Sequence, residues 1–490
     1  MEPVHIGHSR VVQNTAWLGG SKAVEIVLSF VYSIYITRYL GPNLVGIMAT
    51  AMAWVAIAGF ATDLGLGTLL TRDVARDRQQ STANRYFVNV LLLKILLATL
   101  AYVVMVVLLL LFRYSAFTMS IALVLGIGGV VLAASSSTFM SSFRAFERME
   151  FEAAWAVAKR CLLLLGGAIV VMGHWGLLEL ALTHLIVALV ELVYFALVNY
   201  RRFFPIDFSA LGIRFWPYLL RGGLPLGVVG LVQVIYNRVD TLMLSLLRDS
   251  AEVGLYNVAL TFRTSLVLFP TVILSALFPT IAAAFGSRQV LQAIYAKGFK
   301  VLLGLGLPMA AGIALLARPL ILSLYGEQFL SAAPVLQVLI WATAISFLQQ
   351  LFVYAMMATE LGRQCAVLLL VGLVVNVALN ALLIPPLGMA GAATATLAAE
   401  CAMTLAAYVF LVRQVGYFPV GLSILHSAVG VLAMAGFILL LQRLALLWYL
   451  IIPAAAFVYC TVFVLIGGVS KGERQLLRTF IRRALHLTSE

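Results

Sequence analysis

Residues 232–247 read VQVIYNRVDTLMLSLL and belong to an apolar run, 222–247, that is long enough to cross a membrane yet carries Arg238 and Asp240. A charge at the centre of a bilayer costs a few kcal/mol, so each one needs a partner, a water-filled cavity or a task. Because the two residues lie about 200° apart around a helix, they are not simply each other's salt bridge. One polar stripe holds Gly230, Gln233, Asn237, Asp240 and Thr241, with Arg238 at its edge. The stripe predicts a helix that presents a wet face to a cavity.

The composition of the whole chain indicates a membrane protein. Of its 490 residues 63% are hydrophobic and 10% are charged, whereas about one quarter are charged in a soluble globular chain. The mean hydropathy is +1.06. The net charge of +13 falls mostly between the apolar runs, so a nucleic-acid partner is not expected. The four cysteines lie inside apolar runs without CxxC or zinc-type spacing, so neither a disulfide framework nor a metal site is indicated.

The apolar runs predict an all-α integral membrane protein with about fourteen transmembrane helices, at about 20 residues per crossing. The first six helices are expected at 15–37, 44–70, 86–112, 116–140, 153–173 and 176–199. The second six are expected at 222–247, 255–285, 299–325, 333–358, 364–384 and 389–411, followed by accessory helices at 421–442 and 447–468. The first run lacks a signal-cleavage pattern and is expected to stay in place. Basic residues gather in alternate loops, so both termini are predicted to be cytoplasmic.

The two sets of six are predicted to be a repeat. VGIMATA (45–51) can be laid over VGLYNVA (253–259), each at the start of the second helix of its set, and a GxxG pair at 173–176 recurs at 388–391. Since both halves start inside, the repeat is parallel, and such transporters hold the substrate between two lobes that alternate access. The predicted parts are an N-lobe at 1–211, a C-lobe at 212–412 and an accessory region at 413–490. The basic tail, 471–487, is expected to lie on the inner leaflet as an amphipathic helix.

The first helix has its own polar stripe, which includes Lys22 and Glu25. These two could line the cavity, or could only pair with each other at i, i+3. On the eighth helix, Arg263 has no acidic neighbour at i±4 and is the strongest candidate for an anion contact. Arg38 stands at the outer end of the first helix, where it could contact substrate or snorkel to the interface.

Three acidic residues are further candidates. Asp63 has Gly59 and Gly67 at i±4, so a hydrogen bond to a closely packed neighbour is favoured over a transport role. Asp240 could serve in transport or, like Arg238, could bridge helices. Glu400 extends a polar face one turn after Thr396 in the last core helix.

The chain has none of the motifs of a nucleotide-hydrolysing or hydrolytic enzyme. It lacks GxxxxGK[ST], HExxH and GxSxG, and no external loop is long enough to hold the catalytic groups of a membrane glycosyltransferase. Transport is therefore favoured over catalysis.

Several stretches resemble the polysaccharide-biosynthesis (Wzx/O-antigen-type) flippases of the multidrug/oligosaccharidyl-lipid/polysaccharide exporter superfamily. They are 36–47 (ITRYLGPNLVGI), 63–76 (DLGLGTLLTRDVAR), 143–150 (FRAFERME), 240–259 (DTLMLSLLRDSAEVGLYNVA), 277–280 (LFPT), 325–329 (YGEQF) and 376–400 (NVALNALLIPPLGMAGAATATLAAE). The resemblance implies two six-helix lobes, two accessory helices and movement of a polyprenyl-diphosphate-linked saccharide from the inner to the outer leaflet. It also implies a cation-lined cavity for the diphosphate. The candidates for this cavity, Lys22, Arg38, Arg238 and Arg263, come from the interpretation of the helices and not from the resemblance.

The resemblance further implies ion coupling without a bound cofactor. Asp63 and Asp240 match acidic positions of the family and could couple transport to H⁺ or Na⁺, with Glu25, Gln233, Asn237 and Glu400 as further polar-cavity candidates. The expected setting is a bacterial inner membrane or an archaeal cell membrane. Membrane lipids and other polysaccharide-assembly proteins are the expected partners, and the chain is expected to act as a monomer. The alternatives are a MATE-type drug exporter driven by an ion gradient and a lipid II flippase of the same superfamily.

Overall fold

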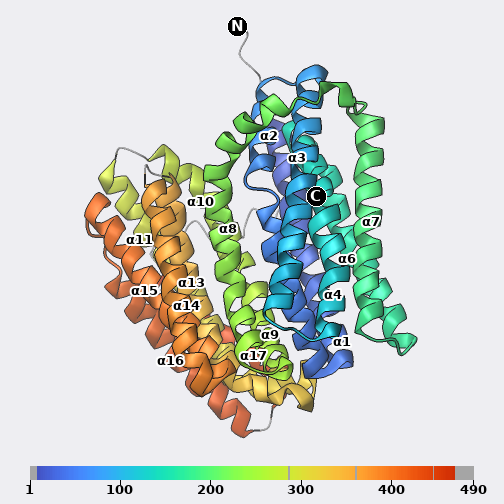
Figure 1. Ribbon diagram of the computed structural model, residues 1–490. Coiled ribbons are helices and arrows are strands. Elements are labelled where there is room, and N and C mark those ends of the chain that lie inside the picture. Colours follow the sequence, from blue (N-terminus) through green and yellow to red (C-terminus); the bar gives the residue numbers. More distant parts are fainter. Residues whose placement is uncertain (1–7, 285–286, 359–360, 445, 470–490) are drawn as a thin grey trace, which may run out of the picture. The chain divides into compact units, whose positions relative to one another are not determined.

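The computed structural model describes residues 8–284, 287–358, 361–444 and 446–469, and within these ranges every regular element is a helix (Figure 1). The predicted amphipathic tail, 471–487, lies outside the described residues. The chain divides into two compact units. Unit 1 comprises Met1–Thr261, Tyr325–Ala332 and Leu369–Thr396, and unit 2 comprises Phe262–Leu324, Ala333–Leu368 and Leu397–Glu490. The predicted boundaries at 211 and 412 remain a prediction.

Unit 1 contains the first eight long helices and most of the ninth. They are α1 (His8–Ala61), α2 (Leu66–Arg76), α3 (Gln80–Leu111), α4 (Ala116–Gly126), α5 (Ala133–Ala145), α6 (Glu150–Met172), α7 (Leu177–Arg202), α8 (Trp216–Leu247) and α9 (Ser250–Leu266). A π-helical segment, Ile127–Leu132, joins α4 to α5.

Unit 2 holds the remaining helices, except that Leu369–Thr396 of α14 and α15 belongs to unit 1. They are α10 (Leu268–Ala283), α11 (Arg288–Leu315), α12 (Ala317–Tyr325), α13 (Ala333–Ala358), α14 (Gly362–Leu387), α15 (Met389–Val415), α16 (Gly421–Arg443) and α17 (Trp448–Leu465).

The helices confirm an all-α, multi-pass membrane protein. In the described ranges, 12 helices are long and apolar enough to cross a membrane, or 13 if the bent pair Ile213–Pro225 and Gly227–Leu247 is one span. The first candidate, Gly19–Ala61, has 43 residues, which is about 65 Å and twice the thickness of the hydrocarbon core. Gly41 breaks it with a φ of 74°, and its length is sufficient for two crossings. The predicted count of about fourteen stays a prediction.

Three expected helices are interrupted, which corrects their predicted bounds. The helix predicted at 44–70 ends at Ala61, that at 255–285 breaks between α9 and α10, and that at 299–325 breaks between α11 and α12. At the first break Leu64 and Gly65 have φ of 42° and 78°. A Cβ added at Gly65 would overlap the Gly223 carbonyl oxygen of α8. Hydropathy averages over the first break, because left-handed residues change the direction of the chain without changing its polarity.

The two repeated stretches contact each other inside unit 1. A Cβ at Gly46 would overlap the Ser250 carbonyl oxygen, and a Cβ at Gly254 would overlap the Pro42 carbonyl oxygen. Gly46 and Gly254 occupy equivalent positions in VGIMATA and VGLYNVA. The helix that follows Gly41 and the start of α9 therefore cross backbone to backbone, as small residues allow in membranes.

The segment between α7 and α8 is hydrogen-bonded to α3 by two asparagines. The Asn84 side chain donates to the Asp207 carbonyl oxygen at 2.8 Å and accepts from the Asp207 amide at 3.0 Å. Asn89 donates to the Ala210 carbonyl oxygen at 3.1 Å and accepts from the Gly212 amide at 3.0 Å. This paired hydrogen bonding, which we term the asparagine strap, fixes the segment to unit 1.

Candidate functional site

Asp240 is a buried carboxylate in unit 1, and its side chain is satisfied by neutral donors. Asn380 on α14 donates to Oδ1 at 2.7 Å. Tyr256 on α9 and Thr396 on α15 donate to Oδ2 at 3.0 and 2.7 Å. Asp240 is 7% exposed, and within the described ranges no ion pair includes it. A buried carboxylate without a cation favours either a proton or a bound cation at this position.

The surroundings of Asp240 are rich in oxygen atoms. Asn380 Nδ2 also donates to Asn376 Oδ1 at 3.0 Å. Asn380 Oδ1, Asn376 Nδ2 and Thr241 Oγ1 are buried and have no hydrogen-bond partner among the described residues. Carboxylate, amide and hydroxyl oxygens are hard ligands that suit Na⁺ better than a soft metal. We call this group (Asp240, Tyr256, Asn376, Asn380 and Thr396) the Asp240 site. Its chemistry fits a proton or a small monovalent cation.

The other polar residues of α8 are not among the contacts of Asp240. Gln233 and Arg238 are half-buried and Asn237 is exposed. Arg238 forms no ion pair in the described part of the chain, so the expectation that Arg238 and Asp240 are not each other's salt bridge agrees with the structure. The cavity roles predicted for Gln233, Asn237 and Arg238 stay predictions.

Arg263 and Glu400, both in unit 2, form one ion pair. The Arg263 Nη2 atom lies 2.5 Å from Glu400 Oε1, and both side chains are largely buried. The absence of an acidic residue at i±4 of Arg263 therefore did not predict an unpaired cation, because its partner Glu400 comes from a helix distant in sequence, α15. An anion that uses Arg263 would have to displace or share Glu400.

The predicted pair of Lys22 and Glu25 forms at 3.0 Å, but a second cation also binds Glu25. The Arg160 Nη2 atom on α6 lies 3.0 Å from Glu25 Oε1. Next to it, Lys159 Nζ lies 2.5 Å from Glu191 Oε2 of α7. The sequence reasoning missed Lys159, Arg160 and Glu191, although a Lys-Arg pair in the middle of the apolar run 153–173 was a signal. We call Lys22, Glu25, Lys159, Arg160 and Glu191 the α6 cluster.

Asp63 forms an ion pair with Lys94 of α3, another residue that the sequence reasoning missed. Lys94 also donates to Ser137 Oγ at 3.1 Å, and the amide of Gly67 donates to Asp63 Oδ1 at 3.2 Å. Asp63 therefore holds the start of α2 in place, in line with the packing role favoured for it. Arg38 is exposed, and its carbonyl oxygen accepts a hydrogen bond from Gln328 at 2.9 Å.

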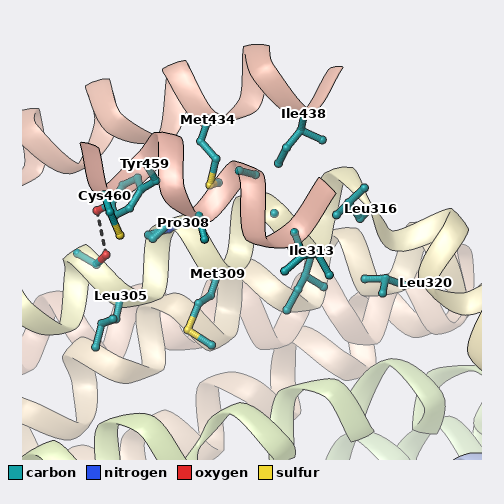
Figure 2. A pocket seen from close by; sticks show the side chains of 15 residues that line it. Leu305, Pro308, Met309, Ile313, Leu316, Leu320, Met434, Ile438, Tyr459 and Cys460 are labelled. Atoms are coloured by element: carbon teal, nitrogen blue, oxygen red, sulfur yellow. Dashed lines mark hydrogen bonds between the residues drawn. The ribbon is translucent and has the colours of Figure 1, made fainter. Parts of the chain in front are cut away.

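Unit 2 contains an apolar cavity of about 400 Å³ between α11, α16 and α17. Figure 2 shows Leu305, Met309 and Ile313 on one side and Met434 and Ile438 on the other. Its one drawn hydrogen bond runs from the Tyr459 hydroxyl to the Gly304 carbonyl oxygen at 2.8 Å (Figure 2). Since carbon and sulfur line the cavity, a saccharide or diphosphate would find almost no polar partner there. The cavity is not the head-group site.

The sequence and the fold match known families. The family described as "Polysaccharide biosynthesis protein" matches residues 11–285, more than half of the chain, and the MatE family matches residues 225–382. The probable flippase AglR of Haloferax volcanii is 30% identical over 172 residues, which are 34% of this chain and 36% of AglR. The lipid II flippase MurJ of Bacillus subtilis strain 168 is 27% identical over 207 residues, 39% of this chain and 38% of MurJ.

These two alignments span little more than a third of each relative. The likeness in fold extends over most of the chain. A solved structure of the lipid II flippase MurJ, in an inward closed conformation, covers 93% of this chain and 98% of its own, with a TM-score of 0.73 at 14% identity.

Proposed function

Because this chain belongs to the polysaccharide biosynthesis protein family, we propose that it moves a polyprenyl-diphosphate-linked saccharide from the cytoplasmic to the outer leaflet. The observation that carries the proposal is that Lys159, Arg160, Arg238 and Arg263 all lie inside helices of the candidate spans. Cations at such depth are costly unless they are paired or serve a polar substrate or pathway, and Arg238 forms no ion pair in the described part of the chain. Both sequence relatives have flippase names, which supports translocation rather than catalysis.

Two related functions are the alternatives. A MATE-type exporter of small cations is favoured by the MatE match at 225–382, but its cavity should hold more carboxylates than cations. The α6 cluster instead has three cations and two carboxylates. A lipid II flippase would also need cations for a diphosphate, so only the head group separates it from the proposed function.

The proposed setting is the cell membrane, with both termini in the cytoplasm and a single chain as the working unit. Membrane lipids surround the candidate spans, and other polysaccharide-assembly proteins are proposed partners. Each half of the repeat would supply one side of the transport path.

The experiment that tests the function measures leaflet accessibility. The purified chain is placed in liposomes with a fluorescent polyprenyl-diphosphate saccharide, and exposure of the sugar at the opposite leaflet is compared with protein-free liposomes. Arg263→Ala and Lys22→Ala should slow exposure if these side chains contact the diphosphate. Arg78→Gln is the control. Arg78 lies in the loop between α2 and α3, outside the candidate site, and its side chain pairs with Glu147 at 2.6 Å. No exposure of any lipid-linked sugar, together with efflux of cationic dyes, would move the protein to the exporter class.

We further propose that the Asp240 site couples transport to H⁺ or Na⁺. Three neutral donors surround the carboxylate, so protonation or a bound Na⁺ changes the charge that the site buries. Asp240→Asn should transport at a rate that no longer responds to either ion gradient, whereas Glu147→Gln should respond as the native protein does. Native transport that stays unchanged when both gradients are collapsed would refute the coupling and leave translocation itself intact.

A further inference from the structure

Three residues of the α6 cluster, Lys159, Arg160 and Glu191, lie near the middle of their helices within unit 1. Arg160 is ten residues after the start of α6 at Glu150 and twelve before its end at Met172, or about 15 and 18 Å along the helix axis. Glu191 is fourteen residues after the start of α7 and eleven before its end. Both ion pairs of these residues therefore lie well away from the ends of α6 and α7, at the level where hydrocarbon would surround a spanning helix.

The two cations of α6 are not sealed inside the unit. The Lys159 side chain is 38% exposed and that of Arg160 is 31% exposed. A charge that faced lipid at this depth would cost several kcal/mol. We therefore expect the exposed parts of these side chains to face water, where a polar ligand can reach them.

The charges in the α6 cluster do not balance. Glu25 is shared, since Lys22 contacts its Oε2 and Arg160 its Oε1, both at 3.0 Å. Glu191 forms an ion pair with Lys159 and with no other cation of the described ranges. Three cations against two carboxylates leave one positive charge in excess. The oxygens of a phosphate group offer a guanidinium the same paired geometry as those of a carboxylate, so a phosphate can take the place that Glu25 occupies.

We infer that Arg160 and Lys159 bind the diphosphate of the lipid-linked substrate, and that Glu25 and Glu191 are internal anions that compete with it. The inference rests on the proposed function and adds residues that neither the sequence motifs nor the relatives assign. In the empty protein the two glutamates hold the cations in place. When substrate enters, its phosphate oxygens replace the carboxylates, and the carboxylates reclaim the cations as substrate leaves.

Competition gives the two kinds of residue opposite effects on affinity. Removing the charge of Arg160 or Lys159 removes a charge-assisted hydrogen bond to phosphate and should weaken binding about ten- to a hundred-fold. Removing the charge of Glu25 removes the competitor and should tighten binding several-fold while slowing release. A merely structural ion pair would behave otherwise, because loss of either partner would disturb the same packing.

The test measures the affinity of the full chain in lipid nanodiscs for farnesyl diphosphate, with farnesol as the uncharged comparison. Arg160→Gln and Lys159→Gln should bind the diphosphate more weakly and farnesol as before, and Arg160→Lys should recover part of the affinity. Glu25→Gln should bind the diphosphate more tightly but turn over more slowly in the liposome assay. Arg78→Gln makes the same charge change outside the cluster and should leave the dissociation constant unchanged. Thermal unfolding of each variant checks that it is folded.

The possible failures are distinguishable. Equal affinity in native protein, Arg160→Gln and Lys159→Gln, or weaker binding by Glu25→Gln, would overturn the assignment while sugar exposure in liposomes keeps the flippase function. A native protein that exposes lipid-linked sugar but does not bind farnesyl diphosphate would overturn it as well. A native protein that does neither removes the site and the proposed function together.

Discussion

The buried pair of Lys94 and Asp63 allows a prediction of unequal costs. The Lys94 side chain is 0% exposed, whereas that of Asp63 is 30% exposed. Asp63→Asn strands a cation that water cannot reach, and loss of one partner of a buried pair costs about 3–5 kcal/mol. Lys94→Met instead leaves a carboxylate that water still reaches and that keeps the Gly67 amide as a donor, so its cost should be nearer ~1–2 kcal/mol.

The double variant Asp63→Asn/Lys94→Met supplies the decisive comparison. It removes both charges and leaves a neutral pair of similar volume, so it should be more stable than Asp63→Asn alone by roughly 2 kcal/mol. The free energy of unfolding is measured in detergent micelles for the native protein and all three variants. Equal costs for the two single variants, or additive costs in the double variant, would refute the reasoning from burial.

Three further predictions follow from the contacts described above. Gly46→Ala should lower the free energy of unfolding by a few kcal/mol, because a Cβ there overlaps the backbone of α9. Gly436→Ala, which has open space around it, should be neutral or stabilising by up to about 1 kcal/mol. Thermal unfolding of the two variants measures the difference. Asn89→Ala should lower the free energy of unfolding by about 1–3 kcal/mol and should speed proteolysis at 203–212. Equal cleavage rates in the variant and the native protein would contradict the role of the asparagine strap. Burial raises the pKa of Asp73, but hydrogen bonds, including one from Arg72 at 2.8 Å, outweigh it and hold the pKa below the usual value. The stability that Asp73 adds is therefore present at neutral pH and is lost as the pH falls through that lowered pKa. Asp73→Asn cannot lose this contribution, so its melting temperature should fall less than that of the native protein between about pH 6 and about pH 3, a range that brackets the ordinary Asp pKa.

The membrane character and most helices could be predicted from the sequence, because a helix that crosses lipid must be apolar along its length and a local average of hydropathy detects this. The breaks could not. The chain turns at Gly65, where the backbone of α8 packs against it. The contacting part of α8 is about 160 residues away in sequence, much farther than the length of one helical span over which hydropathy is averaged. The likeness of VGIMATA and VGLYNVA was visible in the sequence, and the repeat inferred from it stays a prediction. Only the structure shows that Gly46 and Gly254 lie against each other.

For the candidate site, the residue types were predictable and the pairings were not. Asp240, Arg263 and Glu25 stood out because charges are rare in apolar runs. Their partners Asn380, Glu400 and Arg160 come from other helices, and a helical projection reports only neighbours at i±3 and i±4. Lys94 and Arg160 were as conspicuous by composition as the candidates, and were missed because no polar stripe surrounds them.

The asparagine strap has a consequence for how the chain could be divided. Asn84 and Asn89 hold the backbone on both sides of the bond between Ser209 and Ala210. If the peptide bond between these residues were cut, the backbone near each new end would still be hydrogen-bonded to α3. We therefore expect the intact bond to add little to the attachment of this segment. Two separately translated fragments, 1–209 and 210–490, are therefore expected to reassemble in the bilayer.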